Sequence, residues 1–275
     1  MLVNLNDVLL DAQKNKYGVG LFNTIDTDML EGAISAAEEL RSPIIIGTAE
    51  VLLPYGELKL IMPAFVEAAK RATVPVVVHF DHGVSFDKCM EALKLGASSV
   101  MFDGSMESEE INLQNTREMV KIAHSLGATV EGEIGHVGQA ASRDNETNDM
   151  YTTPEEAVYF VEKTGVDALA VAIGTAHGAY KEAPKLDFER LSQIRAQLDT
   201  PLVLHGGSGL SDDDFINVIK CGIAKVNIFT DLCVAGKNAV KAFEGEYLEM
   251  RNAKVEAIKQ AVMYKMKLFG SVNKA

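Results

Sequence analysis

The sequence has few cysteines and no long apolar run. Its three cysteines, Cys89, Cys221 and Cys233, show no CxxC spacing, which argues against disulfides and against a zinc knuckle. No uninterrupted apolar stretch approaches the ~18 residues of a membrane-spanning helix. The first residues, Met1–Asn4, lack the charged-then-apolar pattern of a secretory signal. We therefore expect a cytoplasmic protein with no membrane partner.

Basic residues are also scarce relative to acidic ones. The chain has 26 Lys and Arg against 39 Asp and Glu, which gives a formal net charge of −13. Nucleic acids need clustered Lys and Arg to neutralise their phosphates, so this balance argues against a nucleic acid as partner. It is still compatible with an anionic small molecule, because backbone amides and helix ends can bind one.

Short apolar runs alternate with helical patterns along all 275 residues, of which 47% are hydrophobic. The runs predict eight strands, at Tyr17–Phe22, Pro43–Gly47, Val74–His79, Ser99–Phe102, Thr129–Glu133, Ala168–Ile173, Pro201–His205 and Lys225–Ile228. Strict alternation favours parallel strands covered by helices. Eight units predict an α/β fold, the (β/α)₈ TIM barrel, and an open doubly wound sheet is the rival. We expect one domain over residues 1–275, with a helical extension at about 243–275 packed outside.

Polar residues gather where the predicted strands end. They include Asn23, Thr48, Asp81, His82, Asp103, Glu133, His177, His205, Asn227 and Thr230. In a (β/α)₈ barrel the carboxyl ends of all the strands share one mouth, where active sites of this fold are built. The sequence therefore predicts that these side chains converge, with Asn23 and Thr48 among the residues that contact a substrate.

The stretch Val76–Gly83 is the most informative of these strand ends. An apolar run leads directly into His79, Asp81 and His82. Residues two apart on a strand point the same way, so a local turn is needed before all three can face one pocket. We expect His82 to turn inward as a metal ligand, Asp81 to act as an acid or base, and His79 to support them or to pack inside the barrel. The alternative is a solvated loop in which His82 bonds only to backbone.

Three imidazoles come from three separate strand ends, and each is followed by glycine: His82, His177 and His205. Three neutral imidazoles with an open fourth position are typical of a catalytic zinc site. The open position allows a metal to polarise a carbonyl. His124 and His136 are left out of this set, since the first lies in a predicted helix and the second in a loop.

Two glycine- or hydroxyl-bearing loops follow the last two predicted strands. Gly206–Gly209 precedes a helix that opens with three Asp residues, and Asn227–Thr230 precedes the next helix. Loops at these places form the usual phosphate cradle of such barrels, although the glycines could instead only make tight turns. The polar stretch Gln139–Tyr151 is either a mobile lid over the site or a surface loop.

Taken together, these residues resemble the class II, metal-dependent ketose-bisphosphate aldolases, the family of fructose- and tagatose-bisphosphate aldolases. The resemblance covers nearly the whole chain, at Phe22–Asn23, Ser42–Ile45, His79–Gly83, Asp103–Ser105, Glu131–Gly135, Ala170–Gly178, Leu204–Gly209, Lys225–Asn227 and Lys267–Ser271. It implies a lyase of carbohydrate metabolism that reversibly cleaves a ketose 1-phosphate or 1,6-bisphosphate to dihydroxyacetone phosphate and an aldehyde.

The resemblance also implies roles for individual residues. Asp81 would deprotonate the C4 hydroxyl, and His82, His177 and His205 would hold the catalytic Zn²⁺ (zinc), with Glu133 as an alternative or supporting ligand. The phosphate end of the sugar would bind at Gly178, Gly206, Gly207, Ser208, Asn227 and Thr230. A monovalent cation such as Na⁺ near that phosphate, and assembly as homodimers or homotetramers, are further expectations.

The chain departs from the family pattern in three places. One is the turn after the second predicted strand, Thr48–Glu50, where Glu50 stands in place of the small residue that relatives usually have. Gln139–Ser142 stands where family members usually carry an acid, so the proton exchange on dihydroxyacetone phosphate falls to another loop residue, Asp144 or Glu146. Arg251 and Lys254 stand near the place where many members have an arginine that meets the distal phosphate of the sugar. The identity of the aldehyde partner is therefore open.

Two other functions fit the same fold. One is a non-catalytic subunit that binds sugar phosphates, although Asp81 and the three histidines are all present. The other is a zinc hydrolase in which Asp81 activates a metal-bound water, which the phosphate loops argue against.

Overall fold

The computed structural model describes residues 1–135, 151–176 and 184–275. Within them the strands are β1 (Leu2–Val3), β2 (Val19–Asn23), β3 (Ile44–Ala49), β4 (Val76–Gly83), β5 (Ser99–Phe102), β6 (Thr129–Ile134), β7 (Ala168–Val171), β8 (Leu202–Leu204) and β9 (Ile223–Ile228). The helices are α1 (Leu5–Asn15), α2 (Thr27–Leu40), the 3₁₀ turn η1 (Glu50–Leu52), α3 (Leu58–Arg71), α4 (Phe86–Lys94), α5 (Glu109–Ser125), α6 (Pro154–Thr164), α7 (Phe188–Gln197), α8 (Asp212–Lys220), α9 (Thr230–Ala242) and α10 (Tyr247–Phe269).

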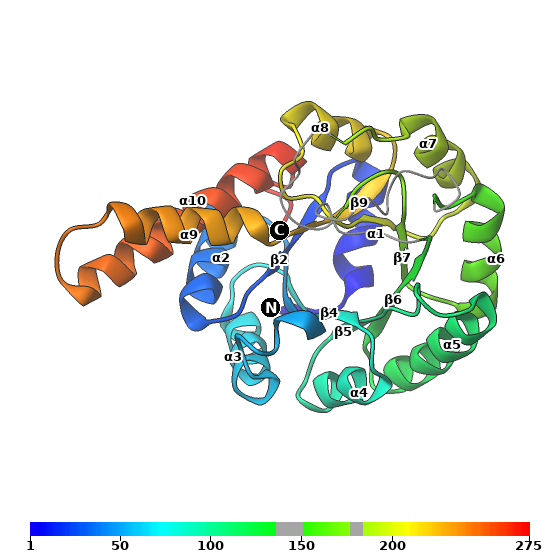
Figure 1. Ribbon diagram of the computed structural model, residues 1–275, viewed down its shortest axis with the longest axis horizontal. Coiled ribbons are helices and arrows are strands. Elements are labelled where there is room, and N and C mark those ends of the chain that lie inside the picture. Colours follow the sequence, from blue (N-terminus) through cyan, green and yellow to red (C-terminus); the bar gives the residue numbers. More distant parts are fainter. Residues whose placement is uncertain (136–150, 177–183) are drawn as a thin grey trace.

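The strands form a closed parallel barrel. Pairing runs in the order β4, β3, β2, β9, β8, β7, β6 and β5, and β5 pairs again with β4 to close the ring. Helices lie between successive strands and surround the barrel (Figure 1). The predicted (β/α)₈ TIM barrel is therefore confirmed, and the open doubly wound sheet is excluded because an open sheet would leave β4 and β5 unpaired.

The apolar residues divide into two layers, as the fold requires. One cluster fills the space between the outer faces of the strands and the covering helices. The other lies inside the barrel at its amino-terminal end, where side chains such as Leu21, Ile45 and Val77 meet α1. Burial on both faces explains why the strands read as continuous apolar runs rather than as alternating patterns.

Two elements near the amino terminus were not predicted. The two-residue strand β1 pairs with the start of β4, and α1 follows it with Leu5, Val8 and Leu9 buried against the barrel interior. The signal for α1 is present in the sequence, because Asn4 and Asp7 form a capping box in front of apolar residues at helical spacing. In Figure 1, α1 lies across the centre of the ring of strands.

The predicted carboxyl-terminal extension is helical and is the longest helix in the described part of the chain. α10 packs along α2 and α9, and the α9–α10 pair reaches out from one side of the barrel (Figure 1). Its last residue, Phe269, is 1% exposed. That ring packs at a tilt against Phe215 with centroids 5.2 Å apart, and the Phe269 carbonyl accepts a hydrogen bond from the backbone N–H of Gly18. The end of α10 is thus part of the barrel's packing.

None of the helices in the described ranges is long and apolar enough to cross a membrane.

The packing of Phe269 makes a direct prediction. Phe269→Ala should lower the free energy of unfolding by about 3–5 kcal/mol, because the buried ring leaves a cavity beneath the barrel. Urea unfolding followed by circular dichroism measures this change. The matched control is Leu248→Ala on the same helix, where the side chain is 70% exposed and the expected change is within about 0.5 kcal/mol. Equal effects of the two substitutions would show that the Phe269 ring is not part of the barrel's packing.

Candidate active site

A backbone irregularity at the end of β4 brings Asp81 and His82 to the same site. The pairing of β4 with β5 shifts register between Phe80 and Gly83, and His82 has a left-handed φ of 43°. A bulge of this kind redirects a side chain, and a non-glycine residue in this conformation costs about 1–3 kcal/mol. The local turn that the sequence analysis required is therefore present.

The carboxylate of Asp81 is buried and held by two side-chain amides. Asn23 Nδ2 donates to its Oδ2 at 2.7 Å, and Asn227 Nδ2 donates to its Oδ1 at 3.0 Å. Burial raises the pKa of Asp81, but the positive fields of His82 and Lys225 and the nearby His79 outweigh burial and lower the pKa well below its usual range. Asp81 is therefore a carboxylate, which can accept a proton from a bound hydroxyl.

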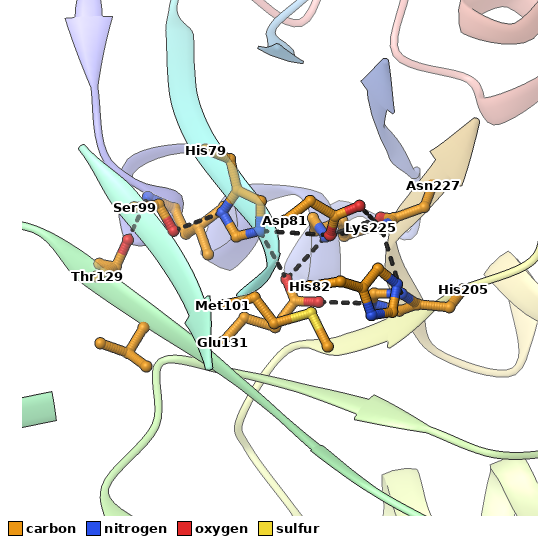
Figure 2. A network of polar contacts seen from close by, with 12 residues as sticks. His79, Asp81, His82, Ser99, Met101, Thr129, Glu131, His205, Lys225 and Asn227 are labelled. Carbon is orange, nitrogen blue, oxygen red and sulfur yellow. Dashed lines mark hydrogen bonds and ion pairs between the residues drawn. The ribbon is translucent and has the colours of Figure 1, made fainter. Parts of the chain in front are cut away.

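His82 and His205 are in direct contact at the mouth of the barrel, with their rings nearly perpendicular (Figure 2). His82 Nε2 and His205 Nδ1 lie 2.6 Å apart. The other ring nitrogens contact carboxylates, His82 Nδ1 with Asp103 Oδ2 at 2.8 Å and His205 Nε2 with Glu131 Oε1 at 2.7 Å. Imidazoles that ligate metals usually carry such a carboxylate on the opposite nitrogen, where it fixes the tautomer and the ring orientation.

Burial and neighbouring charges shift the pKa values of the two imidazoles and of Glu131. Burial raises the pKa of Glu131, but Lys225 and His205 lower it to about 2. Burial lowers the pKa of His82, yet Asp81, Asp103 and Glu133 together raise it to about 9. Burial and the positive charge of His82 lower the pKa of His205. The surrounding carboxylates thus favour a positive charge on His82, whose Nε2 lies against His205 Nδ1.

The donor set at this position suits a divalent metal. Two imidazole nitrogens converge here beside buried carboxylates, which supply the negative charge that would compensate a bound cation. One candidate group of metal ligands is Asp81, His82 and His205, and a second is His82, Asp103 and Glu133; within each group the ligand atoms lie within 4.8 Å of one another. Two of the three predicted histidine ligands are thus brought together, and Glu133 lies beside them. His177 lies outside the described residues.

Below these ligands a layer of polar side chains crosses the barrel interior. Lys225 on β9 contacts Glu131 Oε2 at 2.8 Å and donates to Asn227 Oδ1 at 2.8 Å. His79 contacts Ser99 at 2.8 Å through Nδ1, and its Nε2 lies 3.7 Å from Asp81 Oδ1. His79 thus packs inside the barrel, one of the two positions considered for it.

Sequence reasoning placed Asp103 and Glu131 among the polar residues at the strand ends, but it assigned no chemical role to them or to Lys225. Each contacts a predicted site residue, and Glu131 and Lys225 are fully buried. Spacing gave a usable signal, because Glu131 stands two residues before Glu133 and Lys225 two residues before Asn227, so each pair points to the same side of its strand.

The mouth of the barrel opens into a cavity of about 660 Å³. The predicted substrate residues that line it are Asn23, Gly206, Gly207, Ser208, Asn227 and Thr230. The two predicted phosphate loops are joined, since Phe229 N–H donates to Ser208 Oγ at 3.2 Å. Gly206 is required where it stands, because its φ is +67° and an added Cβ would lie 2.4 Å from the Ala176 carbonyl oxygen.

The remaining predicted site residues lie elsewhere. Thr48 is fully buried on β3 and does not line the cavity, so its contact with substrate stays a prediction. Gly178, Asp144 and Glu146 lie outside the described residues.

Arg251 and Lys254 do not line the mouth cavity. Arg251 Nε pairs with Asp28 Oδ1 at 2.9 Å, and Lys254 Nζ pairs with Asp26 Oδ2 at 2.8 Å. Both lie between α10 and α2, beside a separate cavity of about 500 Å³. Arg251 and Lys254, which stand near the position of the arginine in the family pattern, are therefore already paired with carboxylates of α2 and its amino-terminal cap.

Comparison with known proteins gives one consistent result. The family described as fructose-bisphosphate aldolase class-II matches residues 3–274. The chain is 41% identical to the uncharacterized protein YdjI of Escherichia coli over 96% of both chains, and 38% identical to a fructose-bisphosphate aldolase of Thermus caldophilus over the full length of both. The crystal structure of the E. coli YdjI aldolase superposes with a TM-score of 0.91 at 39% identity over the whole of both chains. A putative fructose-1,6-bisphosphate aldolase of Coccidioides immitis gives 0.90 at 28% identity, over 98% of this chain and 97% of that one.

The raised pKa of His82 predicts how the metal-free protein responds to pH. A histidine whose folded-state pKa is about 9 contributes stability that is fully present below its unfolded pKa of about 6.5 and is lost as the pH rises through 9. With chelator present, the urea midpoint of the wild type should fall between pH 6.5 and 9.5 by more than that of His82→Gln. Parallel pH profiles for the two proteins would contradict a raised pKa of His82 in the folded protein.

Proposed function

The chain belongs to the class II fructose-bisphosphate aldolase family and is an aldolase, a carbon–carbon lyase; from this we propose that it is a zinc-dependent enzyme that reversibly cleaves a ketose 1-phosphate or 1,6-bisphosphate to dihydroxyacetone phosphate and an aldehyde. One observation carries the proposal. A buried carboxylate, Asp81, held by two amides, lies beside two imidazoles that aim their nitrogens at one point.

We propose that His82 and His205 hold the metal, with His177 as the third imidazole and Glu133 as an alternative or supporting ligand. Family membership supports a metal, and an imidazole-rich set suits Zn²⁺. When bound, the ion would polarise the ketone oxygen of the substrate and stabilise the negative charge that develops there as the carbon–carbon bond breaks. Asp103 and Glu131 keep the two rings oriented by accepting hydrogen bonds from their other nitrogens.

Asp81 acts as the base in cleavage. Its carboxylate takes the proton of the C4 hydroxyl, the C3–C4 bond breaks as the C4 oxygen becomes the aldehyde carbonyl, and the bonding electrons pass into the three-carbon ketone fragment. In condensation Asp81 returns the proton to the new hydroxyl. The amides of Asn23 and Asn227 hold the carboxylate in place, so little reorganisation is needed when the proton moves.

The phosphate binds at the two joined loops after β8 and β9. Gly206 and Gly207 allow close approach of the backbone, while Ser208 and Thr230 line the same cavity. Thr230 is also the first residue of α9, and a helix amino terminus favours an anion. This arrangement explains how a strongly acidic protein can hold a phosphate without a cluster of basic side chains.

The remaining expectations are also proposals. Gly178 would complete the phosphate site, and Asp144 or Glu146 would exchange the proton of dihydroxyacetone phosphate. Na⁺ or another monovalent cation near the phosphate and assembly as a homodimer or homotetramer follow from the resemblance to the family. A single domain over residues 1–275 and a cytoplasmic location follow from the sequence pattern.

A condensation assay tests the function directly. Purified protein is incubated with dihydroxyacetone phosphate and a panel of aldehydes, both phosphorylated and neutral, and consumption of dihydroxyacetone phosphate is followed with a coupled dehydrogenase. We expect turnover that is lost in chelator and restored by Zn²⁺. Full activity after complete metal removal would overturn the metal-dependent mechanism. No turnover with any aldehyde, together with tight binding of dihydroxyacetone phosphate, would favour the non-catalytic subunit.

Two substitutions separate the roles of Asp81 and His205. Asp81→Ala should lower kcat at least about 100-fold, because a positioned proton acceptor is lost, while zinc stays bound. His205→Ala should lose both turnover and zinc. Steady-state kinetics and metal analysis after gel filtration measure the two properties. Zinc at full occupancy in His205→Ala would contradict its assignment as a ligand.

A further inference from the structure

A fully buried lysine, Lys225, lies inside the barrel between Glu131, which contacts His205, and Asn227, which contacts Asp81. Barrel interiors of this fold are usually filled by branched apolar side chains, and an ammonium group there loses its hydration. Lys225 is 0% exposed. Its Nζ contacts two side chains, Glu131 on β6 and Asn227 on its own strand β9 (Figure 2).

The first contact leads to the metal site. Lys225 Nζ lies 2.8 Å from Glu131 Oε2, and the other oxygen of the same carboxylate contacts His205 Nε2 at 2.7 Å. With one oxygen fixed by the ammonium group, the second is aimed at the imidazole, so that the nitrogen facing His82 is His205 Nδ1. Lys225 therefore sets the direction of Glu131, and Glu131 sets the tautomer of His205.

The second contact leads to the base. An Asn side chain has one acceptor and one donor end that differ little in shape, so its orientation must be set by its partners. Lys225 Nζ donates to Asn227 Oδ1 at 2.8 Å, which leaves Asn227 Nδ2 to donate to Asp81 Oδ1 at 3.0 Å. A reversed amide would place its oxygen against the Asp81 carboxylate.

We propose that Lys225 is a positioning residue that couples the two parts of the site, orienting the ligand His205 through Glu131 and the base Asp81 through Asn227. The expected effect of Lys225 on turnover rests on the proposed function. The expected effect of Lys225 on metal binding rests only on the presence of the metal site. A lysine that merely balanced the buried charge of Glu131 would need no contact with Asn227.

The test replaces Lys225 by methionine, which has similar length and no ammonium group. Lys225→Met should weaken Zn²⁺ binding about 10- to 100-fold, as loss of a residue that orients a ligand does. Competition with a chelating dye measures this affinity, and the visible absorption of the Co²⁺-loaded protein should change because the ligand field changes. At saturating zinc, kcat should also fall about 10-fold or more, because the amide that holds Asp81 is released.

Double variants separate the two contacts. In a Glu131→Gln background, Lys225→Met should change zinc affinity less than about twofold, since the carboxylate it orients is gone. This pair of substitutions also removes both buried charges together, which protects folding if the single variant is unstable. In an Asn227→Ala background, Lys225→Met should change kcat at saturating zinc by less than about twofold.

Lys259→Met is the matched control. Lys259 is a partly buried lysine on α10 that pairs with Glu39 at 2.6 Å, away from the barrel mouth. Lys259→Met should leave zinc affinity, the Co²⁺ spectrum and kcat unchanged. Thermal unfolding of all the variants shows whether a loss of stability alone accounts for an effect.

The outcomes distinguish this inference from the proposed function. Unchanged zinc affinity, Co²⁺ spectrum and kcat in folded Lys225→Met would overturn the positioning role while leaving the aldolase assignment intact. Losses that simply add in the double variants would also overturn it. If the wild type shows no turnover, the proposed function fails, and the zinc affinity and the Co²⁺ spectrum still decide whether Lys225 acts through Glu131 on His205.

Discussion

Pairing between buried carboxylates and nitrogen groups is the constraint on which this site depends. Asp81, Glu131 and Asp103 lie where water cannot solvate them well, and each is held in its charged form by imidazole, amide or ammonium donors. An unpaired buried charge would cost several kcal/mol, so removing one donor affects the others. This mutual dependence gives the rings and carboxylates fixed directions before any substrate binds, which is the condition for efficient proton transfer and charge stabilisation.

The barrel makes that pairing possible because it brings distant strands to one axis. His82 comes from β4, Glu131 from β6 and His205 from the end of β8, yet His205 contacts both of the others. The strand scaffold is apolar and rigid where it meets the helices, while the polar residues lie inside and at the carboxyl ends. The cost of the left-handed backbone at His82 is tolerated because the surrounding sheet fixes its neighbours.

Much of the fold was predictable because the periodicity of the strands and the caps of the helices are local. The strand ends also predicted the meeting of Asp81, His82 and His205, since one barrel mouth collects them. The charged partners Glu131 and Lys225 could not be paired from sequence, because which lysine meets which acid depends on how the strands close. Strand limits shifted for a related reason: final bounds such as those of β7 are set by pairing with neighbouring strands rather than by composition.

The position of α1 determines which end of the barrel is accessible to a small molecule. Leu5, Val8, Leu9 and Ala12 fill the amino-terminal end of the barrel, and the buried polar layer around Lys225 occupies the interior between them and the mouth. Any molecule that binds in the mouth cavity must therefore both enter and leave past the carboxyl ends of the strands.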